Sequence, residues 1–175
     1  QNTGVYRIAA SGGQAEVVPG TSLPHSLLAK AALSPDGKTL ALFTSVLKPE
    51  AKTVSKRIVF VGPGASVRNL DLDPALSPVF PSLGPPSSSA FHFSPDAKAL
   101  AFVVEEDGVD NIWLQPIDGS KGQKLTNFKN SQTIQDFRWS PDGKYLALLR
   151  FNSVSDVVLL RDTGNPARLF PGKDQ

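Results

Sequence analysis

The sequence contains no cysteine and no methionine. Without cysteine neither a disulfide nor a thiolate metal site can form, although this absence does not select a cellular compartment. Because a natural reading frame begins with methionine, a chain that opens on Gln1 is expected to be a processed protein or a piece cut from a longer one. The repeats described below begin in the middle of a repeat unit, which favours a piece cut from a longer protein.

Strong net charge and long apolar runs are also missing. The sequence has 18 Lys and Arg residues and 16 Asp and Glu residues, and these charges are scattered. It therefore shows no basic patch for a nucleic-acid backbone. No run approaches the roughly 20 apolar residues of a membrane-spanning helix, and the N-terminus lacks the pattern of a secretory signal. We therefore expect neither nucleic-acid binding nor membrane contact by this segment.

A ten-residue motif occurs three times, at residues 33–42, 93–102 and 139–148. Each copy passes from an apolar residue through Ser-Pro-Asp to an apolar run, which predicts a β-hairpin. Proline suits the second turn position, and the glycine that follows suits a left-handed conformation. Ala97 replaces that glycine in the middle copy, so this turn is expected to be strained or slightly different. The predicted turn residues are Ser34, Pro35, Asp36, Gly37, Ser94, Pro95, Asp96, Ser140, Pro141, Asp142 and Gly143.

A second pattern gives the period of the repeat. Apolar strands centred on Val5, Ile58, Ile112 and Val158 are each followed by a glycine-containing turn, and these centres are 53, 54 and 46 residues apart. A period of about 45 to 50 residues that holds four short strands is typical of a β-propeller blade. Helical periodicity is absent over any useful length.

We therefore predict an all-β fold, a β-propeller segment of about three and a half four-stranded antiparallel blades. Near-continuous apolar runs such as 100–104 support this prediction, because both faces of such a strand must be covered. The single segment 1–175 divides into a half blade at 1–20, a blade at 21–73, a Pro/Ser-rich connecting loop at 74–89, and blades at 90–129 and 130–175. The expected strands are 5–9, 15–18, 28–33, 40–45, 57–61, 67–72, 90–93, 99–104, 111–115, 123–126, 135–139, 145–150, 156–161 and 167–170.

Three and a half blades do not make a closed ring, because closed propellers have about four to eight blades. The ring is therefore incomplete or closed by an oligomer, and two copies would supply seven blades and cover the open sheet edges. A long exposed loop is expected at 46–56. The proline-rich loop at 74–89 is interpreted as an extended surface linker, with a docking site for a Pro-recognising domain as the alternative.

Residues that could carry chemistry are few. His25 and His92 are 67 residues apart, and neither has a carboxylate or second histidine at ligand spacing, so a structural role at a blade seam is favoured over catalysis or metal binding. His92 occupies the repeat position that Arg138 fills in the next copy. Ser66 lies in Gly-Ala-Ser-Val-Arg, which lacks the final glycine of a nucleophile elbow, and is expected to be a turn residue.

Four carboxylates gather within residues 105–110, but a calcium site needs six to eight oxygens on a defined loop, and the spacing matches no such pattern. A solvated hairpin tip turned by Asp107 and Gly108 is favoured. The aspartate of each Ser-Pro-Asp turn recurs in every repeat, whereas an active site is built once, so it is expected to accept local backbone hydrogen bonds. Trp113 and Trp139 are expected in the blade core. We assign no catalytic, cofactor-binding or metal-ligating residue.

With these motifs the chain resembles the TolB-type, WD-like β-propeller repeats of bacteria, whose signature is Trp or Phe followed by Ser-Pro-Asp-Gly-Lys and an apolar strand. Residues 110–119, 124–129, 139–143 and 155–159 look more particularly similar to the C-terminal propeller portion appended to bacterial serine/threonine protein kinases. The chain itself has no Gly-rich loop, His-Arg-Asp or Asp-Phe-Gly motif, so the catalytic part of such a kinase would lie upstream.

The resemblance implies a non-catalytic binding or sensing module, a fragment of a larger bacterial protein such as a receptor-like kinase or a TolB-like protein. Its partner would be a protein or a small ligand, without a cofactor. An extracytoplasmic (periplasmic) location is expected, with the cytoplasm as the alternative. The competing hypothesis is the substrate-gating propeller of a prolyl-oligopeptidase-type hydrolase, which would require a hydrolase domain in the parent sequence.

Overall fold

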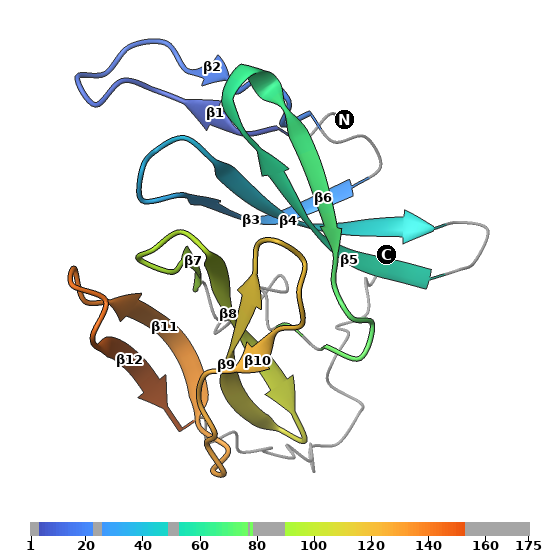
Figure 1. The fold of residues 1–175 in the computed structure, drawn as a ribbon, viewed down its shortest axis with the longest axis vertical. Coiled ribbons are helices and arrows are strands. Elements are labelled where there is room, and N and C mark those ends of the chain that lie inside the picture. Colours follow the sequence, from blue (N-terminus) through green and yellow to red (C-terminus); the bar gives the residue numbers. More distant parts are fainter. Residues whose placement is uncertain (1–3, 23–25, 49–52, 77, 79–89, 153–175) are drawn as a thin grey trace, which may run out of the picture.

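The computed structural model describes residues 4–22, 26–48, 53–76, 78 and 90–152. These residues form twelve strands and one short 3-10 turn (Figure 1). The strands are β1 (Tyr6–Arg7), β2 (Glu16–Val17), β3 (Ser26–Leu33), β4 (Leu40–Lys48), β5 (Thr53–Val61), β6 (Val67–Asp71), β7 (Phe91–Phe93), β8 (Ala99–Glu106), β9 (Val109–Pro116), β10 (Gln123–Lys124), β11 (Thr133–Trp139) and β12 (Leu146–Phe151), and the 3-10 turn η1 is Pro63–Ala65.

The strands form four antiparallel sheets in which neighbours in sequence are neighbours in space. β3–β6 and β7–β10 are complete four-stranded sheets, whereas β1–β2 and β11–β12 are two-stranded within the described residues. Figure 1 shows the sheets following one another in chain order from β1–β2 to β11–β12. Four-stranded meanders of this kind are propeller blades. The all-β, incomplete propeller expected from the repeats is therefore confirmed.

The long loop expected at 46–56 is wrong for residues 46–48 and 53–56, which lie in strands, and residues 49–52 lie outside the described residues. β4 and β5 continue their ladder to its far end, where Val46 pairs with Ser55 and Leu47 with Val54. Each residue added to this ladder pairs with a residue of the opposite strand, so the length of β4 depends on that of β5.

Other strands are shorter than expected. β10 ends before Thr126, because the Thr126 hydroxyl accepts the N–H of Ile112 at 2.9 Å in place of a backbone carbonyl. β1 and β2 have two residues each and belong to a sheet with no further described strand to extend them. The strands expected at 156–161 and 167–170, and most of the loop at 74–89, lie outside the described residues.

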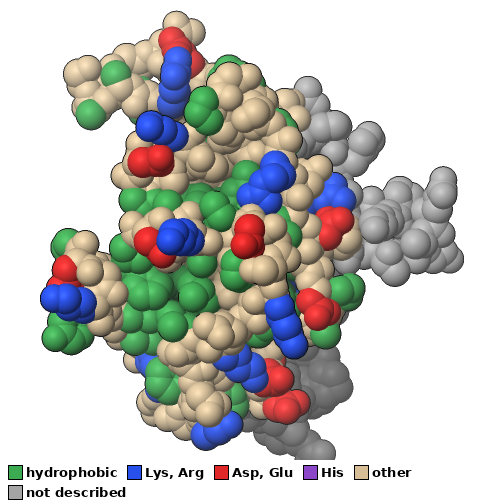
Figure 2. Space-filling view, in the orientation of Figure 1, with side chains coloured by type: hydrophobic (Ala, Val, Ile, Leu, Met, Phe, Trp, Pro, Cys, Tyr) green, Lys and Arg blue, Asp and Glu red, His purple; other side chains and the backbone are tan. Residues whose placement is uncertain are grey.

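The largest core cluster lies between the two complete blades. Phe43 of β4 packs edge-on to Phe91 of β7, with ring centroids 6.3 Å apart, and lies 6.5 Å from the ring of Phe102 on β8. All three rings are at most 2% exposed. Truncating one such ring costs about 3–5 kcal/mol, so this cluster fixes the two blades to each other. Figure 2 shows apolar side chains in the hollows between the hairpin turns of successive sheets.

The sheets converge along their first strands. β3 lies against β7, and Figure 1 shows β7 between β3 and β11. At the next seam, His92 of β7 stacks edge-on against Phe137 of β11, with ring centroids 5.4 Å apart. Propeller blades surround a central channel, so the edge along which the sheets converge is the axial edge. We call β3, β7 and β11 the axial strands.

Candidate functional site

The three Ser-Pro-Asp turns share one hydrogen-bonded geometry. In the first, the Ser34 hydroxyl donates to Asp36 Oδ1 at 2.6 Å and accepts the Thr39 N–H at 2.9 Å. Asp36 Oδ1 also accepts the Lys38 N–H at 3.1 Å. The bond from Ser34, followed by that from the Lys38 N–H, lowers the pKa of Asp36. The aspartate is thus a local acceptor, and the motif builds a turn.

The same contacts recur in the two other turns. The residues named from the sequence all lie in these turns: Ser34, Pro35, Asp36, Gly37, Ser94, Pro95, Asp96, Ser140, Pro141, Asp142 and Gly143. Gly37 and Gly143 have φ of 70° and 71°, and Ala97 has φ of 58°. The middle turn therefore keeps the common shape and holds a non-glycine residue in the left-handed region, which is sterically disfavoured.

The structure describes some of the remaining sequence candidates. Ser66 follows η1, and its carbonyl accepts the Gly62 N–H at 2.8 Å, so it is a turn residue. His25 lies outside the described residues. Among the described residues, no group of three or more His, Cys, Asp or Glu side chains is placed to hold a metal ion. No helix in this described part is long and apolar enough to cross a membrane.

The acidic stretch at 105–110 is only partly a solvated hairpin tip. Asp107 and Gly108, with φ of 53° and 74°, turn the β8–β9 hairpin as expected. Asp110, however, is 6% exposed, and its Oδ2 accepts the Ile134 N–H of β11 at 2.8 Å. The prediction of a solvated hairpin tip is therefore wrong for Asp110, because β11 of the next sheet packs against it. Burial raises the pKa of this carboxyl, against the opposing effect of the Ile134 N–H.

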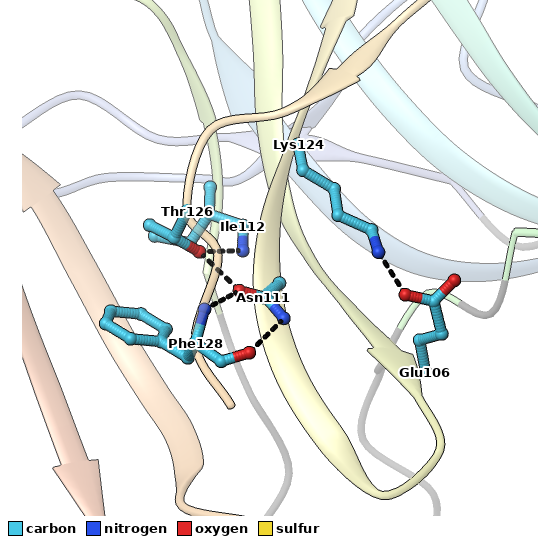
Figure 3. Close-up of polar contacts among 6 residues, drawn as sticks. All are labelled: Glu106, Asn111, Ile112, Lys124, Thr126 and Phe128. Atoms are coloured by element: carbon cyan, nitrogen blue, oxygen red, sulfur yellow. Dashed lines mark hydrogen bonds and ion pairs between the residues drawn. The ribbon is translucent and has the colours of Figure 1, made fainter. Parts of the chain in front are cut away.

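Asn111, the next residue on β9, forms hydrogen bonds with the segment that leads to β11 (Figure 3). Its Oδ1 accepts the Phe128 N–H at 2.7 Å and the Thr126 hydroxyl at 3.0 Å. On the other side of β9, Lys124 forms an ion pair with Glu106. The guanidinium of Arg150 lies 3.7 Å from the centroid of the Phe128 ring, in the range of a cation–π contact. The Lys124–Glu106 pair lies within the β7–β10 sheet, whereas the Arg150 contact joins β12 to the segment that follows β10. These contacts have a structural role.

A polar cluster on the axial strands is the best candidate for a binding site. It comprises Lys30 of β3, His92 of β7, and Asp136 and Arg138 of β11, and we call it the axial cluster. Arg138 Nη1 donates to Asp136 Oδ1 at 2.6 Å and to His92 Nε2. His92 Nε2 lies 3.7 Å from Asp136 Oδ1. Three successive sheets therefore contribute charged or titratable groups to one place.

The axial cluster is positively biased and open to solvent. The side chain of Arg138 is 60% exposed, and those of His92 and Asp136 are 28% and 30% exposed. Burial, then the charge of Arg138, lowers the pKa of His92, and burial lowers the pKa of Lys30. Donation from Arg138 requires an unprotonated Nε2, which agrees with a neutral His92. Two cations, a neutral imidazole and one carboxylate suit an anionic ligand group.

Sequence reasoning found one part of this cluster and missed the rest. It placed His92 and Arg138 at the same repeat position, and the structure brings these two residues into contact across the seam between β7 and β11. Lys30 and Asp136 share another repeat position, two residues earlier, and were not singled out. The available signal was the recurrence of charged residues at axial positions of strands that are otherwise apolar.

Together, the sheets and the axial cluster define a class of protein, a β-propeller segment with a polar site at its axial edge. The chain belongs to the family described as Lipoprotein LpqB beta-propeller domain, whose sequence model matches residues 5–171.

The fold is TolB-like. The structure is similar to TolB from Acinetobacter baumannii with a TM-score of 0.58 and 23% identity, over 89% of this chain and 34% of that one. It is also similar to a putative TolB from Agrobacterium tumefaciens, with a TM-score of 0.56 and 18% identity, over 89% of this chain and 48% of that one. At these identities the likeness concerns the fold alone.

One curated relative is an enzyme. Dipeptidyl aminopeptidase BIII of Pseudoxanthomonas mexicana is 31% identical over 67 residues, which are 38% of this chain and 10% of that protein. This chain thus spans about a tenth of the length of the curated relative that it matches.

Proposed function

We propose that this segment is a non-catalytic binding module of an extracytoplasmic bacterial protein, and that the axial cluster binds an anionic group, such as the carboxylate of a peptide. The observation that carries the proposal is the meeting of Lys30, His92 and Arg138 on three successive axial strands, with Arg138 largely exposed. The family description as a lipoprotein propeller supports the location. A TolB-like protein or a receptor-like serine/threonine kinase is the proposed parent.

Arginine is well suited to this role. Its planar fork binds a carboxylate through two parallel hydrogen bonds, which lysine cannot do. Within the described residues, Arg138 contacts Asp136, His92 and the Phe137 carbonyl through Nη1, so Nε and Nη2 would engage the ligand. Asp136 holds Nη1 and orients the fork, while the neutral His92 accepts a second hydrogen bond from Nη1.

The test is a titration of the isotope-labelled chain, followed by nuclear magnetic resonance, with N-acetyl-Gly-Gly and with its C-terminal amide. We expect saturable shifts of the His92 and Arg138 side-chain signals with the carboxylate and none with the amide. Arg138→Gln should abolish the shifts of the His92 signals. Arg7→Gln, which removes an exposed cation from β1, is the matched control and should retain them. Equal responses to both probes, or an unchanged response in Arg138→Gln, would refute the proposed anion site.

The proposed absence of catalysis has a separate test. The purified chain is assayed for hydrolysis of aminoacyl p-nitroanilides and for transfer of phosphate from ATP, and we expect background rates in both. Activity above background that a single substitution in this chain removes would overturn the non-catalytic assignment.

The substrate-gating propeller of a peptidase is the second candidate. It is favoured by the 67-residue match to the dipeptidyl aminopeptidase. The parent gene distinguishes the two functions, because a hydrolase domain downstream supports gating, whereas a kinase or regulator domain upstream supports sensing.

A further inference from the structure

The imidazole of His92 cannot take up a proton on Nε2 without a rearrangement of the axial cluster. An arginine only donates hydrogen bonds, so Nε2 accepts from Arg138 Nη1 and carries no proton. The same Nη1 donates to Asp136 Oδ1 at 2.6 Å and to the Phe137 carbonyl at 2.9 Å. Three acceptors therefore share the two hydrogens of one nitrogen.

The groups around His92 come from every strand packed against it. Burial lowers the pKa of His92 most, the charges of Arg138 on β11 and Lys30 on β3 lower it as well, and Asp136 on β11 raises it. β8, the neighbour of β7 within the same sheet, places Ala101 opposite His92 and adds no charge. We therefore expect a neutral His92 at pH 7 and its protonation below the usual value of about 6.5.

A proton on Nε2 changes the partners of all three side chains. The imidazolium no longer accepts from Arg138, and two cations then face each other. Asp136 Oδ1 lies 3.7 Å from His92 Nε2, so this carboxylate is at hand to accept the new N–H. Arg138 Nη1 keeps the Phe137 carbonyl and has a hydrogen to spare, while the axial cluster gains one positive charge.

We propose that a proton on His92 switches the axial cluster to a state that binds anions more tightly, because it draws Asp136 away from Arg138 and frees the guanidinium for the ligand. This inference rests on the proposed anion site and adds the regulation of that site. In the neutral state Asp136 occupies Nη1 as an internal anion. In the protonated state Nη1 joins Nε and Nη2 in facing the ligand, beside an added charge.

Proton binding and anion binding must strengthen each other by the same factor. Couplings between sites are typically 5–150-fold, and one added charge with one freed donor corresponds to about tenfold. An anion that binds about tenfold more tightly to the protonated cluster therefore lowers the acid dissociation constant of His92 by that same factor. This reciprocity gives two independent measurements of one quantity.

The test measures the affinity for N-acetyl-Gly-Gly by nuclear magnetic resonance from about pH 5 to pH 8, where the probe stays ionised because its carboxyl pKa is about 3.5. We expect the affinity to rise about tenfold toward the acid end, in step with the titration of His92. Saturating probe should lower the His92 acid dissociation constant by the same factor, and the C-terminal amide of the probe should leave that constant unchanged.

Two histidine variants isolate the group that titrates. His92→Gln keeps an acceptor for Arg138 but cannot be protonated, so its affinity for the probe should not change over this pH range. His25→Gln replaces the only other histidine of the sequence, and as the matched control it should keep the pH dependence of the wild type. It also identifies the His92 signal, and circular dichroism checks the fold of both variants.

The outcomes separate this inference from the proposed function. Absence of probe binding at every pH refutes the anion site, and the switch with it. Binding of constant affinity, or equal pH dependence in the wild type and His92→Gln, overturns the switch and leaves the anion site. If His92→Gln does not fold, the wild type decides, because a His92 dissociation constant that saturating probe leaves unaltered overturns the switch.

Discussion

The middle Ser-Pro-Asp turn can be stabilised by one substitution, Ala97→Gly. Ala97 has φ of 58° in a turn whose counterparts are Gly37 and Gly143, at 70° and 71°. The change leaves the hydrogen bonds of the turn intact, since these involve Ser94 and Asp96. It removes only the steric cost that a Cβ carries in the left-handed region.

The magnitude follows from two opposing effects. The left-handed conformation costs an alanine roughly 1–2 kcal/mol in the folded state. Glycine has greater conformational freedom in the unfolded chain, which offsets about 0.4–1 kcal/mol of the gain from removing that cost. We expect Ala97→Gly to raise the free energy of unfolding by about 0.5–1 kcal/mol. Gly37→Ala should lower it by a similar amount, because a Cβ at Gly37 meets no atom within 4 Å.

Gly143 provides a graded comparison. A Cβ there would lie 3.3 Å from Cγ and 3.4 Å from Cβ of Pro95 in the neighbouring turn, so Gly143→Ala should cost more than Gly37→Ala. The β-branched Gly143→Val should cost more again. Urea unfolding measures each free energy, and in a chain of this length 1 kcal/mol shifts Tm by about 2–4 °C. A destabilised Ala97→Gly, or an unchanged Gly143→Val, would refute the assigned turn conformation.

Two further predictions concern buried polar groups. Ser94→Ala should lower the free energy of unfolding by about 1–3 kcal/mol, because the buried Ala99 N–H loses its acceptor. The equivalent Ser140→Ala, in an exposed turn, should lower it by less. Urea unfolding measures both losses. Asp110→Asn should be more stable than wild type at neutral pH, because its amide oxygen can still accept the Ile134 N–H without a buried charge. Because the native pKa of Asp110 is raised, its contribution to the free energy of unfolding is favourable below its unfolded pKa of about 3.9 and is lost as pH rises through the native pKa. This part of the pH dependence of stability should vanish in the variant. Equal losses in the two serine variants, or an unaltered pH profile in Asp110→Asn, would contradict these assignments.

Local features of the fold could be predicted from the sequence, and contacts between blades could not. The turns were found because proline, glycine and the serine and aspartate hydrogen bonds act within six residues of chain. The end of β4 was misplaced because the length of a strand depends on the strand beside it, and Val46 pairs with Ser55 of β5. Asp110 was misread for a similar reason, since the strand that buries it is 24 residues away.

The all-β class, the repeat period and the three turns follow from the residues alone, because a repeated motif adopts the same local geometry each time. Only the tertiary structure brought Lys30, His92, Asp136 and Arg138 together on the axial strands. It alone exposed Leu33 while burying its counterpart Phe93. The physical reason is that a side chain's exposure, charge environment and partners depend on the neighbouring sheet, which residue types and spacing do not specify.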